Sequence, residues 1–438
     1  MKAGALTFFW FRRDLRLQDN TGLSKALSAC ENVQPVFIFD TDILSKLPKD
    51  DARVTFIHDT ITELKQALSE HGSDLWVYYG KPEDVWQNLL DTYDVEAIYL
   101  NHDYEPAAIK RDRAVAGICQ KCGPDFFSFK DHVIFEKDEV LKPDGLPYTI
   151  FTPYSKRWKM AYEAGTLARE PEHKMKFENF HQVSKQQEEL SLADIGFERN
   201  DLEIPARKAA PSLIKTYDKT RDFPAVRGTS RLGVHLRFGT ISVRQLAKKT
   251  GKLNETYLNE LIWRDFYAMI LWHFPHVVSR SFKPKYDLIP WENDMEKFEA
   301  WKKGETGYPI VDAGMRELNE TGYMHNRVRM VVASFLCKHL LIDWRLGELY
   351  FAQKLLDYDL ASNNGGWQWA AGCGCDAAPY FRVFSPDAQT KKFDEKLEYI
   401  NTWVKDLNEL SYPEPIVEHK VARLRAIEVY KSALNSAE

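Results

Sequence analysis

The chain has 438 residues, a mass of 50.9 kDa and a formal net charge of -5 at pH 7. Hydrophobic residues make up 44% and charged residues 28%, a balance that excludes an entirely disordered chain. No apolar run approaches the roughly 20 residues that cross a bilayer. At about 150 residues per domain, the length predicts two or three domains.

The N-terminus does not follow the pattern of a cleavable signal peptide, because the apolar run at residues 5–10 is followed directly by arginines. Six cysteines are too few for a disulfide framework in a chain of this size. We therefore expect a cytoplasmic protein. No segment has the pattern of an oligomer interface, so we expect a monomer.

Charge is unevenly distributed along the chain. Residues 1–200 hold 25 Lys and Arg against 33 Asp and Glu, whereas residues 201–438 hold 34 against 31. Within the second part, residues 201–250 alone hold 11 against 4. A local basic excess of this kind suits phosphate binding whatever the total charge, although a solvated charged face explains it as well.

Two kinds of segment alternate over the first 135 residues. Short apolar runs rich in β-branched and aromatic residues predict buried parallel strands at 5–10, 34–39, 75–79, 97–101 and 126–135. Helical periodicity lies between them at 20–30, 51–71, 82–92 and 106–121. The alternation predicts an α/β domain built on a doubly wound parallel sheet over residues 1–135. The first strand is not followed by G-x-G-x-x-G, which argues against a standard dinucleotide site there.

The rest of the chain divides into a polar connector and a helical region. Residues 136–205 are rich in proline and polar residues, and we expect them to wrap over the surface with short helices. From residue 206 to 438 the apolar residues recur at helical spacing, which predicts an all-α second domain.

Several common site motifs are missing. Cys119 and Cys122 form a C-x-x-C pair, but no second pair follows at the spacing of a zinc site. His325 and His339 have no H-E-x-x-H context, and neither G-x-S-x-G nor a P-loop occurs. We therefore expect no metal site.

Four polar segments of the second region contain side chains suited to ligand binding or catalysis. Thr229-Ser230-Arg231-Leu232 precedes a helical run, where hydroxyl groups and free N–H groups suit a phosphate, although a simple N-cap is an equal alternative. Glu260, Trp263, Arg264 and Tyr267 share one helix face, which suits a polar cavity with a stacking wall, or else an amphipathic helix with a Glu260–Arg264 pair. The other two segments are 324–330 and 357–369, whose arginines and aspartates need partners if they are buried.

These motifs together resemble the photolyase/cryptochrome family, and within it the class I enzymes that repair cyclobutane pyrimidine dimers. The resemblance runs along the whole chain, at residues 9–16, 229–232, 259–267, 306–313, 324–330, 363–369 and 376–382. It implies an FAD held in a U shape inside the helical domain. It also implies light-driven repair, in which excited reduced FAD donates an electron to a dimer flipped out of DNA and the electron later returns.

The resemblance assigns cofactor-binding roles to particular positions. The FAD pyrophosphate and neighbouring groups would be held by Tyr217, Thr229, Ser230, Arg231 and Leu232. The isoalloxazine and ribose would be surrounded by Asn326, Arg329, Asp357, Asp359 and Asn363, and Arg264 would also bind the cofactor. Asn363 would face flavin N5, where a neutral amide stabilises the reduced anionic flavin, and Arg329 would pair with Asp357.

It also assigns the substrate site and an electron path. Trp263 and Trp369 would pack against the dimer, Glu260 would bind a thymine carbonyl edge, and Arg327 would offer positive charge. Asn326 and Met330 would contact the lesion as well. Trp367, Trp344 and Trp291, in this order from the flavin to the surface, would return electrons to an oxidised flavin.

Three positions depart from or sharpen the family pattern. Tyr323 stands where close relatives often carry Trp. Residues 106–108, Pro-Ala-Ala, stand where folate-binding relatives carry an Asn-Glu pair, which argues against a folate antenna and leaves a deazaflavin, another flavin or no antenna open. A single His in segment 324–330 argues against repair of 6-4 photoproducts.

Two alternatives remain. A cryptochrome-type blue-light receptor would signal through partners, but Asn363, Glu260, Trp263 and Met330 favour repair, and no long signalling tail follows the helical pattern. A nucleotide-binding α/β enzyme with an unrelated helical domain would bind no flavin.

Overall fold

The structure, a computed structural model, describes residues 5–165 and 175–435. Of these, the residues within Met1–Glu139, Lys159–Arg207 and Leu232–Lys249 form a first compact unit, and those within Val140–Trp158, Lys208–Arg231 and Thr250–Glu438 form a second. The units are interleaved along the chain, and the domain boundaries expected at residues 135 and 205 stay a prediction. Residues 166–174 of the expected connector lie outside the described residues.

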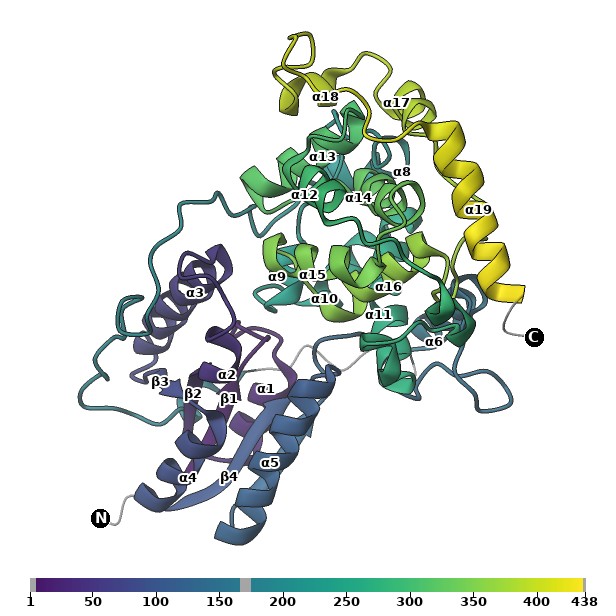
Figure 1. Ribbon diagram of the computed structural model, residues 1–438. Helices are drawn as coiled ribbons and strands as arrows, with labels where there is room; N and C mark the ends of the chain where they lie inside the picture. The colour runs from purple at the N-terminus through teal and green to yellow at the C-terminus, as the bar shows by residue number, and fades with distance from the viewer. Residues whose placement is uncertain (1–4, 166–174, 436–438) are drawn as a thin grey trace. The chain divides into compact units, whose positions relative to one another are not determined.

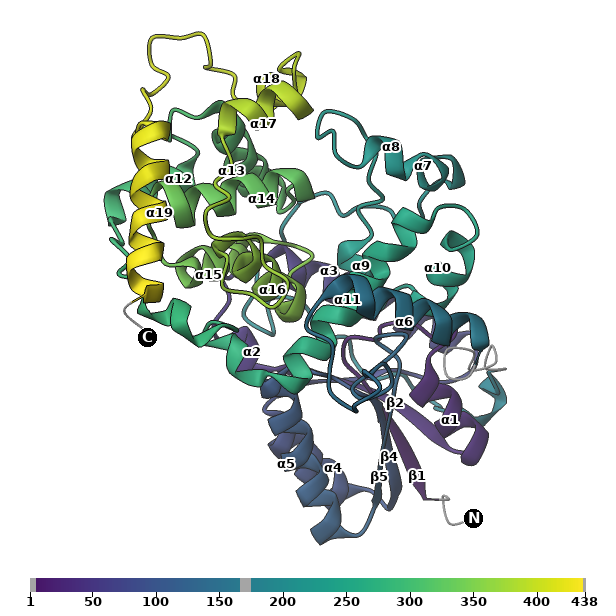
Figure 2. The same cartoon turned by 90° about the vertical axis from the view of Figure 1, so that its right-hand side faces the viewer.

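The first unit is built on a five-stranded parallel sheet with the order β3-β2-β1-β4-β5 (Figures 1 and 2). Its strands are β1 (Leu6–Phe11), β2 (Val33–Asp40), β3 (Trp76–Gly80), β4 (Val95–Asn101) and β5 (Asp125–Phe129). The helices that alternate with them are α1 (Thr21–Ala29), α2 (Thr41–Leu44), α3 (Ala52–Ser69), α4 (Pro82–Thr92) and α5 (Pro106–Cys122).

Both faces of the sheet are covered, as the apolar strand sequences require. Successive side chains of β1 point to opposite faces, so Phe9 and Phe11 pack with α1 and α3, whereas Phe8 and Trp10 pack with α4 and α5. This arrangement confirms the doubly wound α/β fold.

The fifth strand is shorter than the sequence predicted. It ends at Phe129, and the expected extension to residue 135 leaves the sheet. The reason is Asp131, a buried carboxylate whose Oδ1 accepts hydrogen bonds from the Thr21 N–H at 3.0 Å and from Arg244 Nη2 at 2.8 Å. A carboxylate that binds these groups draws the chain out of the strand ladder.

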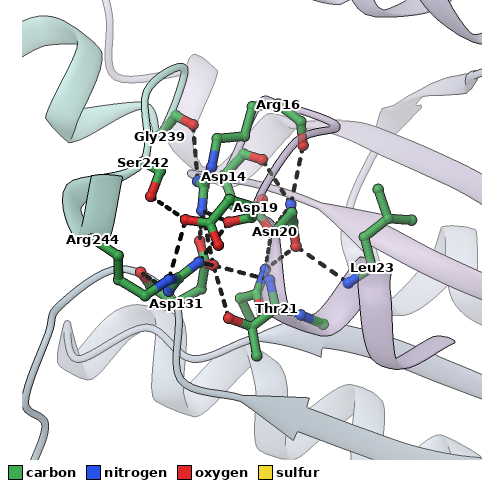
Figure 3. Close-up of polar contacts among 12 residues, drawn as sticks. Asp14, Arg16, Asp19, Asn20, Thr21, Leu23, Asp131, Gly239, Ser242 and Arg244 are labelled. Carbon is green, nitrogen blue, oxygen red and sulfur yellow. Dashed lines mark hydrogen bonds and ion pairs between the residues drawn. The ribbon is translucent and has the colours of Figure 1, made fainter. Parts of the chain in front are cut away.

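Figure 3 shows the polar cluster around Asp131, which we call the Asp131 cluster: Asp14, Arg16, Asp19, Asn20, Thr21, Asp131, Ser242 and Arg244. Arg16 Nη2 donates to both oxygens of Asp131 at 2.8 and 2.7 Å, and Arg244 Nε donates to Asp19 at 3.2 Å. Burial alone would raise the pKa of Asp131, but the guanidinium groups of Arg16 and Arg244 outweigh burial and hold the pKa well below its usual range.

The Asp131 cluster fastens helix α10 (Val243–Thr250) and the turn before it to the carboxyl edge of the sheet, and the short helix α9 (Gly233–Arg237) precedes this turn. Gly239 lies between them with φ +65°, and a Cβ there would come within 2.2 Å of the Arg13 carbonyl oxygen. Only glycine allows this approach of the two backbones. The first unit thus fills the sheet edge with its own polar side chains.

The second unit is helical, which confirms the all-α prediction (Figure 2). Its longer helices are α11 (Glu255–His273), α12 (Met295–Lys303), α13 (Pro309–Thr321), α14 (Asn326–Ser334), α15 (Trp344–Lys354), α16 (Leu360–Ala371), α17 (Pro386–Phe393) and α19 (His419–Asn435). The shorter ones are α7 (Pro211–Lys215), α8 (Tyr217–Thr220), η2 (Pro275–Val278), η3 (Pro284–Leu288), the π-helix η4 (Phe335–His339) and α18 (Glu398–Trp403). The segment expected to be a connector, residues 136–205, contains α6 (Phe151–Ala164) and η1 (Phe177–Asn179).

The core of the second unit lies between α13, α14, η4, α15 and α16, and includes Trp301, Leu336, Trp344 and Trp367. Helix α16 packs against α11, α14 and α15, so side chains from these four helices come together. Within the described part of the chain, no helix has both the length and the apolar character needed to cross a membrane.

Candidate functional site

Helix α16 presents an amide toward α15. Asp359 caps the helix by accepting a hydrogen bond from the Ser362 N–H at 3.0 Å, and this cap places Asn363 in the first turn. Asn363 Nδ2 donates to the backbone carbonyl of Glu348 at 3.1 Å and to its Oε1 at 2.8 Å. Both amide hydrogens are directed at Glu348, so Oδ1 of Asn363 is left to accept a hydrogen bond from another group.

Glu348 was missed by the sequence analysis. It lies 15 residues before Asn363 on another helix, and no local motif connects the two positions. Burial raises the pKa of Glu348, and the hydrogen bond from Asn363 opposes the rise.

Arg329 on α14 pairs with Asp357, as expected. Its Nη2 lies 3.2 and 3.0 Å from the two carboxylate oxygens, and its Nε donates to the Met324 carbonyl at 2.7 Å. Burial disfavours the charge of Arg329, but Asp357 more than compensates and raises the pKa. A cation is therefore held at a fixed place next to α16.

The hydroxyl groups of segment 229–231 bind tyrosines and do not cap a helix. Thr229 Oγ1 lies 3.1 Å from the Tyr323 hydroxyl, and Ser230 Oγ accepts from the Tyr257 hydroxyl at 2.9 Å. Helix α9 begins after Leu232 without a side-chain cap, so the simple N-cap alternative is wrong.

Arg231 holds the turn at the end of this segment. Its φ of +51° is rare for a residue with a Cβ, and its guanidinium lies 4.4 Å from the centre of the Tyr323 ring. Leu232 is buried and belongs to the first unit. Tyr217 lies edge-on to Tyr257 with ring centres 5.1 Å apart, and its burial raises its pKa.

Helix α11 carries the predicted polar face. The ion pair that the structure shows for Glu260 is with Arg221, next to α8, and sequence analysis missed this partner. Burial raises the pKa of Glu260 and Arg221 opposes the rise. Arg264 lies one turn further along α11.

Trp263 is stacked on Phe151 of α6, with ring centres 3.7 Å apart and an angle of 3° between the rings. One face of the Trp263 ring is therefore covered by Phe151, and only the opposite face is open to stack on a ligand. The expected role as a stacking wall did not predict this cover. No local sequence pattern connects Phe151 with Trp263, because Phe151 lies over 100 residues away in the expected connector.

Helix α14 brings together the residues expected at the lesion. Asn326 is its exposed first residue, and Met330 is half-buried one turn later. Arg327 Nη2 donates to Asp222 at 2.7 Å, and the guanidinium lies 4.3 Å from the centre of the Phe393 ring. Arg327 Nε is buried and has no hydrogen-bond partner among the described residues. His325 caps α14, a role that its spacing in the sequence does not indicate.

The tryptophans of the expected electron path share one core. Trp367 and Trp344 are buried in it, and Trp291 is half-buried against it. Gly347 is required by Trp367, because a Cβ there would come within 2.2 Å of the indole. Trp369 is half-buried, 6.5 Å from the Phe384 ring centre.

The donor set of the second unit fits a dinucleotide flavin. Thr229, Ser230 and Arg231 offer hydroxyl and guanidinium groups to phosphate oxygens, and Asn363 Oδ1 can accept from a ring N–H. Buried donors at α14 have no partner among the described residues. No group of His, Cys, Asp or Glu side chains suited to a metal ion occurs in residues 5–165 and 175–435.

Comparison with known families gives two matches. A family described as the FAD binding domain of DNA photolyase matches residues 257–411, and one described as DNA photolyase matches residues 7–174. Among curated proteins, the deoxyribodipyrimidine photo-lyase of Alkalihalophilus pseudofirmus is 36% identical over 479 aligned residues, covering 98% of this chain and 98% of the relative.

Solved structures agree. A class III photolyase from Agrobacterium tumefaciens matches with a TM-score of 0.87 and 31% identity, covering 99% of this chain and 98% of that one. An archaeal photolyase from Sulfolobus tokodaii, solved with two FAD molecules, matches with a TM-score of 0.83 and 37% identity, covering 98% and 100%. A cryptochrome from Synechocystis matches with a TM-score of 0.84, and its 24% identity supports a shared fold alone.

Proposed function

Because the chain belongs to the DNA photolyase family, we propose that it repairs cyclobutane pyrimidine dimers in DNA under light, with FAD in the second unit. The observation that carries the proposal is the Asn363–Glu348 pair. Its geometry leaves a neutral amide oxygen as the acceptor at the position that the family resemblance assigns to flavin N5.

FAD, when bound in its reduced form and excited by light, supplies the electron that splits the dimer. The residues of this chain bind and orient. Thr229, Ser230 and Arg231 would hold the pyrophosphate, and Tyr217 would support that end of the cofactor. Arg329, fixed by Asp357, keeps a positive charge beside the isoalloxazine and favours its anionic form. Arg264, Asn326, Asp359 and Asn363 complete this group.

The dimer binds beside α11 and α14. Ionised Glu260 accepts a hydrogen bond from a thymine N–H, whereas protonated Glu260 donates one to a thymine carbonyl. The raised pKa of Glu260 increases the fraction of the protonated form near neutral pH. Arg327 offers a guanidinium where negative charge develops. Trp263 uses the face opposite Phe151, and Asn326, Met330 and Trp369 pack against the lesion.

We also propose the electron path Trp367, Trp344, Trp291. All three indoles belong to or pack against one core, and Trp291 is partly exposed, as the surface end of such a path requires. The path would carry electrons from a reductant in solution, such as a thiol, through Trp291 to an oxidised flavin under light.

We propose that a second chromophore, if the protein binds one, is a flavin or a deazaflavin and not a folate. Helix α5 begins at Pro106, so the Asn-Glu pair of folate-binding relatives is replaced by Pro-Ala-Ala at its start. The Sulfolobus tokodaii relative contains two FAD molecules. Mass spectrometry of the chromophores released from the purified protein tests this choice.

The deciding experiment is illumination of the chemically reduced protein with an oligonucleotide that carries one cyclobutane dimer. We expect the dimer to be converted to two thymines with turnover. A dimer that stays intact under blue light, with FAD fully reduced, would contradict the proposal. Parallel reactions with a 6-4 photoproduct should give no repair, which tests the expected class.

A further inference from the structure

His325 occupies the N-cap of α14, directly before Asn326. Its Nδ1 accepts a hydrogen bond from the Arg327 backbone N–H at 3.2 Å. A neutral imidazole carries one proton, and the nitrogen that accepts a hydrogen bond cannot hold it. The cap therefore fixes the tautomer of His325 with the proton on Nε2.

The Nε2–H of His325 is buried and has no hydrogen-bond partner among the described residues. The residue as a whole is 3% exposed, so bulk water does not satisfy this donor. Buried donors without an acceptor are rare in folded proteins because they are costly to desolvate. Such a donor points to a group that the folded chain does not itself provide.

The ring also stays neutral. Burial lowers the pKa of His325 to about 4, and the charges of Arg329, Arg327 and Arg231 act in the same direction. Asp222 opposes them, and Glu317 lies close enough to accept the His325 backbone N–H at 3.3 Å. At neutral pH His325 is therefore a donor of fixed orientation and no charge.

The surroundings indicate the acceptor. Tyr323, two residues before His325, touches Thr229 at 3.1 Å and lies under the guanidinium of Arg231. Arg329, on the first turn after His325, lies 5.7 Å from the centre of the same Tyr323 ring. Residues assigned to the two ends of the cofactor thus meet around the Tyr323–His325 segment, among guanidinium groups that favour an oxygen-rich ligand.

We propose that the Nε2–H of His325 donates a hydrogen bond to an oxygen atom of bound FAD, which makes His325 a further cofactor-binding residue. The inference rests on the proposed function, because it takes FAD as the ligand. The N-cap bond to Arg327 and the bond to FAD use different ring nitrogens, so His325 links the start of α14 to the cofactor.

The matched variants are His325→Asn and His325→Ala. An asparagine keeps an oxygen that can cap α14 but lacks the distant Nε2–H, whereas alanine loses both. We expect His325→Asn to bind FAD about 10- to 100-fold more weakly than the parent, the range typical of a hydrogen bond to a charged group, with its thermal unfolding temperature unchanged in the absence of FAD. His325→Ala should lose the same affinity and also unfold at lower temperature.

His235 provides the control. It is also buried, but its Nδ1 lies 2.8 Å from Thr240 Oγ1 and its Nε2 lies 2.6 Å from the Pro205 carbonyl. His235→Asn should therefore lower the unfolding temperature and leave FAD affinity unchanged. FAD affinity is measured by fluorescence titration of the full-length apoprotein with FAD.

A second readout does not depend on any variant. In the parent labelled with 15N-histidine, the Nε2–H signal of His325 should move and exchange more slowly when FAD binds. Unchanged FAD affinity in His325→Asn, or an Nε2 signal that FAD does not move, would overturn the inference while the proposed function stands. A parent that binds no FAD at all would overturn both.

Discussion

The two units each hold a cluster of buried charge, and the clusters differ in how they are completed. In the Asp131 cluster of the first unit, carboxylates receive donors from Arg16, Thr21 and Arg244, all within the unit (Figure 3). Of its labelled side chains, Arg16 alone has a buried polar atom, Nε, without a partner among the described residues.

The second cluster, around α14 and α16, is completed differently. Arg329 and Arg327 have carboxylate partners, but His325 Nε2 and Arg327 Nε have no partner among the described residues, and the Asn363 amide keeps its oxygen for another group. Buried charge is therefore of two kinds in this protein. One kind holds segments of the chain together, and the other is arranged for a ligand.

The largest effect is expected from a substitution that breaks the Asp131 cluster. Arg244→Met should lower the free energy of unfolding by about 3 kcal/mol, because Asp131 and Asp19 lose a buried partner. Urea denaturation measures this. The control is Arg199→Met, whose pair with Asp59 is about half exposed and should contribute no more than about 1 kcal/mol. Equal losses in the two variants would contradict a structural role for the Asp131 cluster.

Asp131 and its neighbour Asp14 should contribute to stability with opposite pH dependence. The pKa of Asp131 lies below its usual range, so its stabilisation is complete above about pH 4.5 and is lost as pH falls through the folded-state pKa, by about 2 kcal/mol in a typical paired case. Urea denaturation of the parent and Asp131→Asn should therefore give a difference that is constant from pH 7 to about pH 4.5 and shrinks below.

The contribution of Asp14 to stability should change with pH in the opposite direction. Burial raises its pKa, so its contribution favours folding at low pH and is lost as pH rises through the folded-state pKa. The difference between the parent and Asp14→Asn should shift in favour of the parent on acidification. Parallel pH profiles for the two aspartates would be inconsistent with this division.

Asn363→Asp tests the second cluster. It places a carboxyl group against Glu348, and two adjacent buried carboxyl groups cannot both be ionised. The amide donors are lost, and we expect dimer splitting per bound, reduced FAD to fall by about 10- to 30-fold. Asn364→Asp is the matched control one residue away, since Asn364 Nδ2 binds the Val277 carbonyl. It should cost stability and spare the reaction of each bound FAD.

The smallest expected effect concerns the substrate side. Glu260→Ala should lower repair by about 3- to 10-fold, the range of one hydrogen bond, while FAD stays bound. Repair rate and flavin absorbance, measured on the same sample, give the two quantities. Loss of FAD from this variant would move Glu260 from the substrate side to the cofactor.

Much of the fold could be predicted from sequence because strands of a buried parallel sheet are continuous apolar runs. The first four strands of the chain, β1 to β4, and the four helices predicted among the strands lie within a few residues of their predicted positions. The fifth strand was overextended because Val133, Ile134 and Phe135 are apolar and buried without belonging to the sheet. Only the tertiary position of Asp131 explains where the strand ends.

The site was harder to predict where partners are distant in sequence. The Arg329–Asp357 pair followed from the family resemblance and is confirmed. The Glu348 partner of Asn363, the Arg221 partner of Glu260 and the Phe151 stack on Trp263 were not predicted. Each depends on how one helix packs against another, which no local spacing encodes.

Amide hydrogen exchange of the full-length protein with and without FAD tests whether the cluster around α14 and α16 is the one arranged for a ligand. FAD should slow exchange in α14 and α16, where the open donors and the Asn363 oxygen lie, and leave α1 and α10, which the Asp131 cluster fastens, unchanged. Slower exchange in α1 and α10, with none in α14 and α16, would contradict the claim that the second cluster is the one arranged for a ligand.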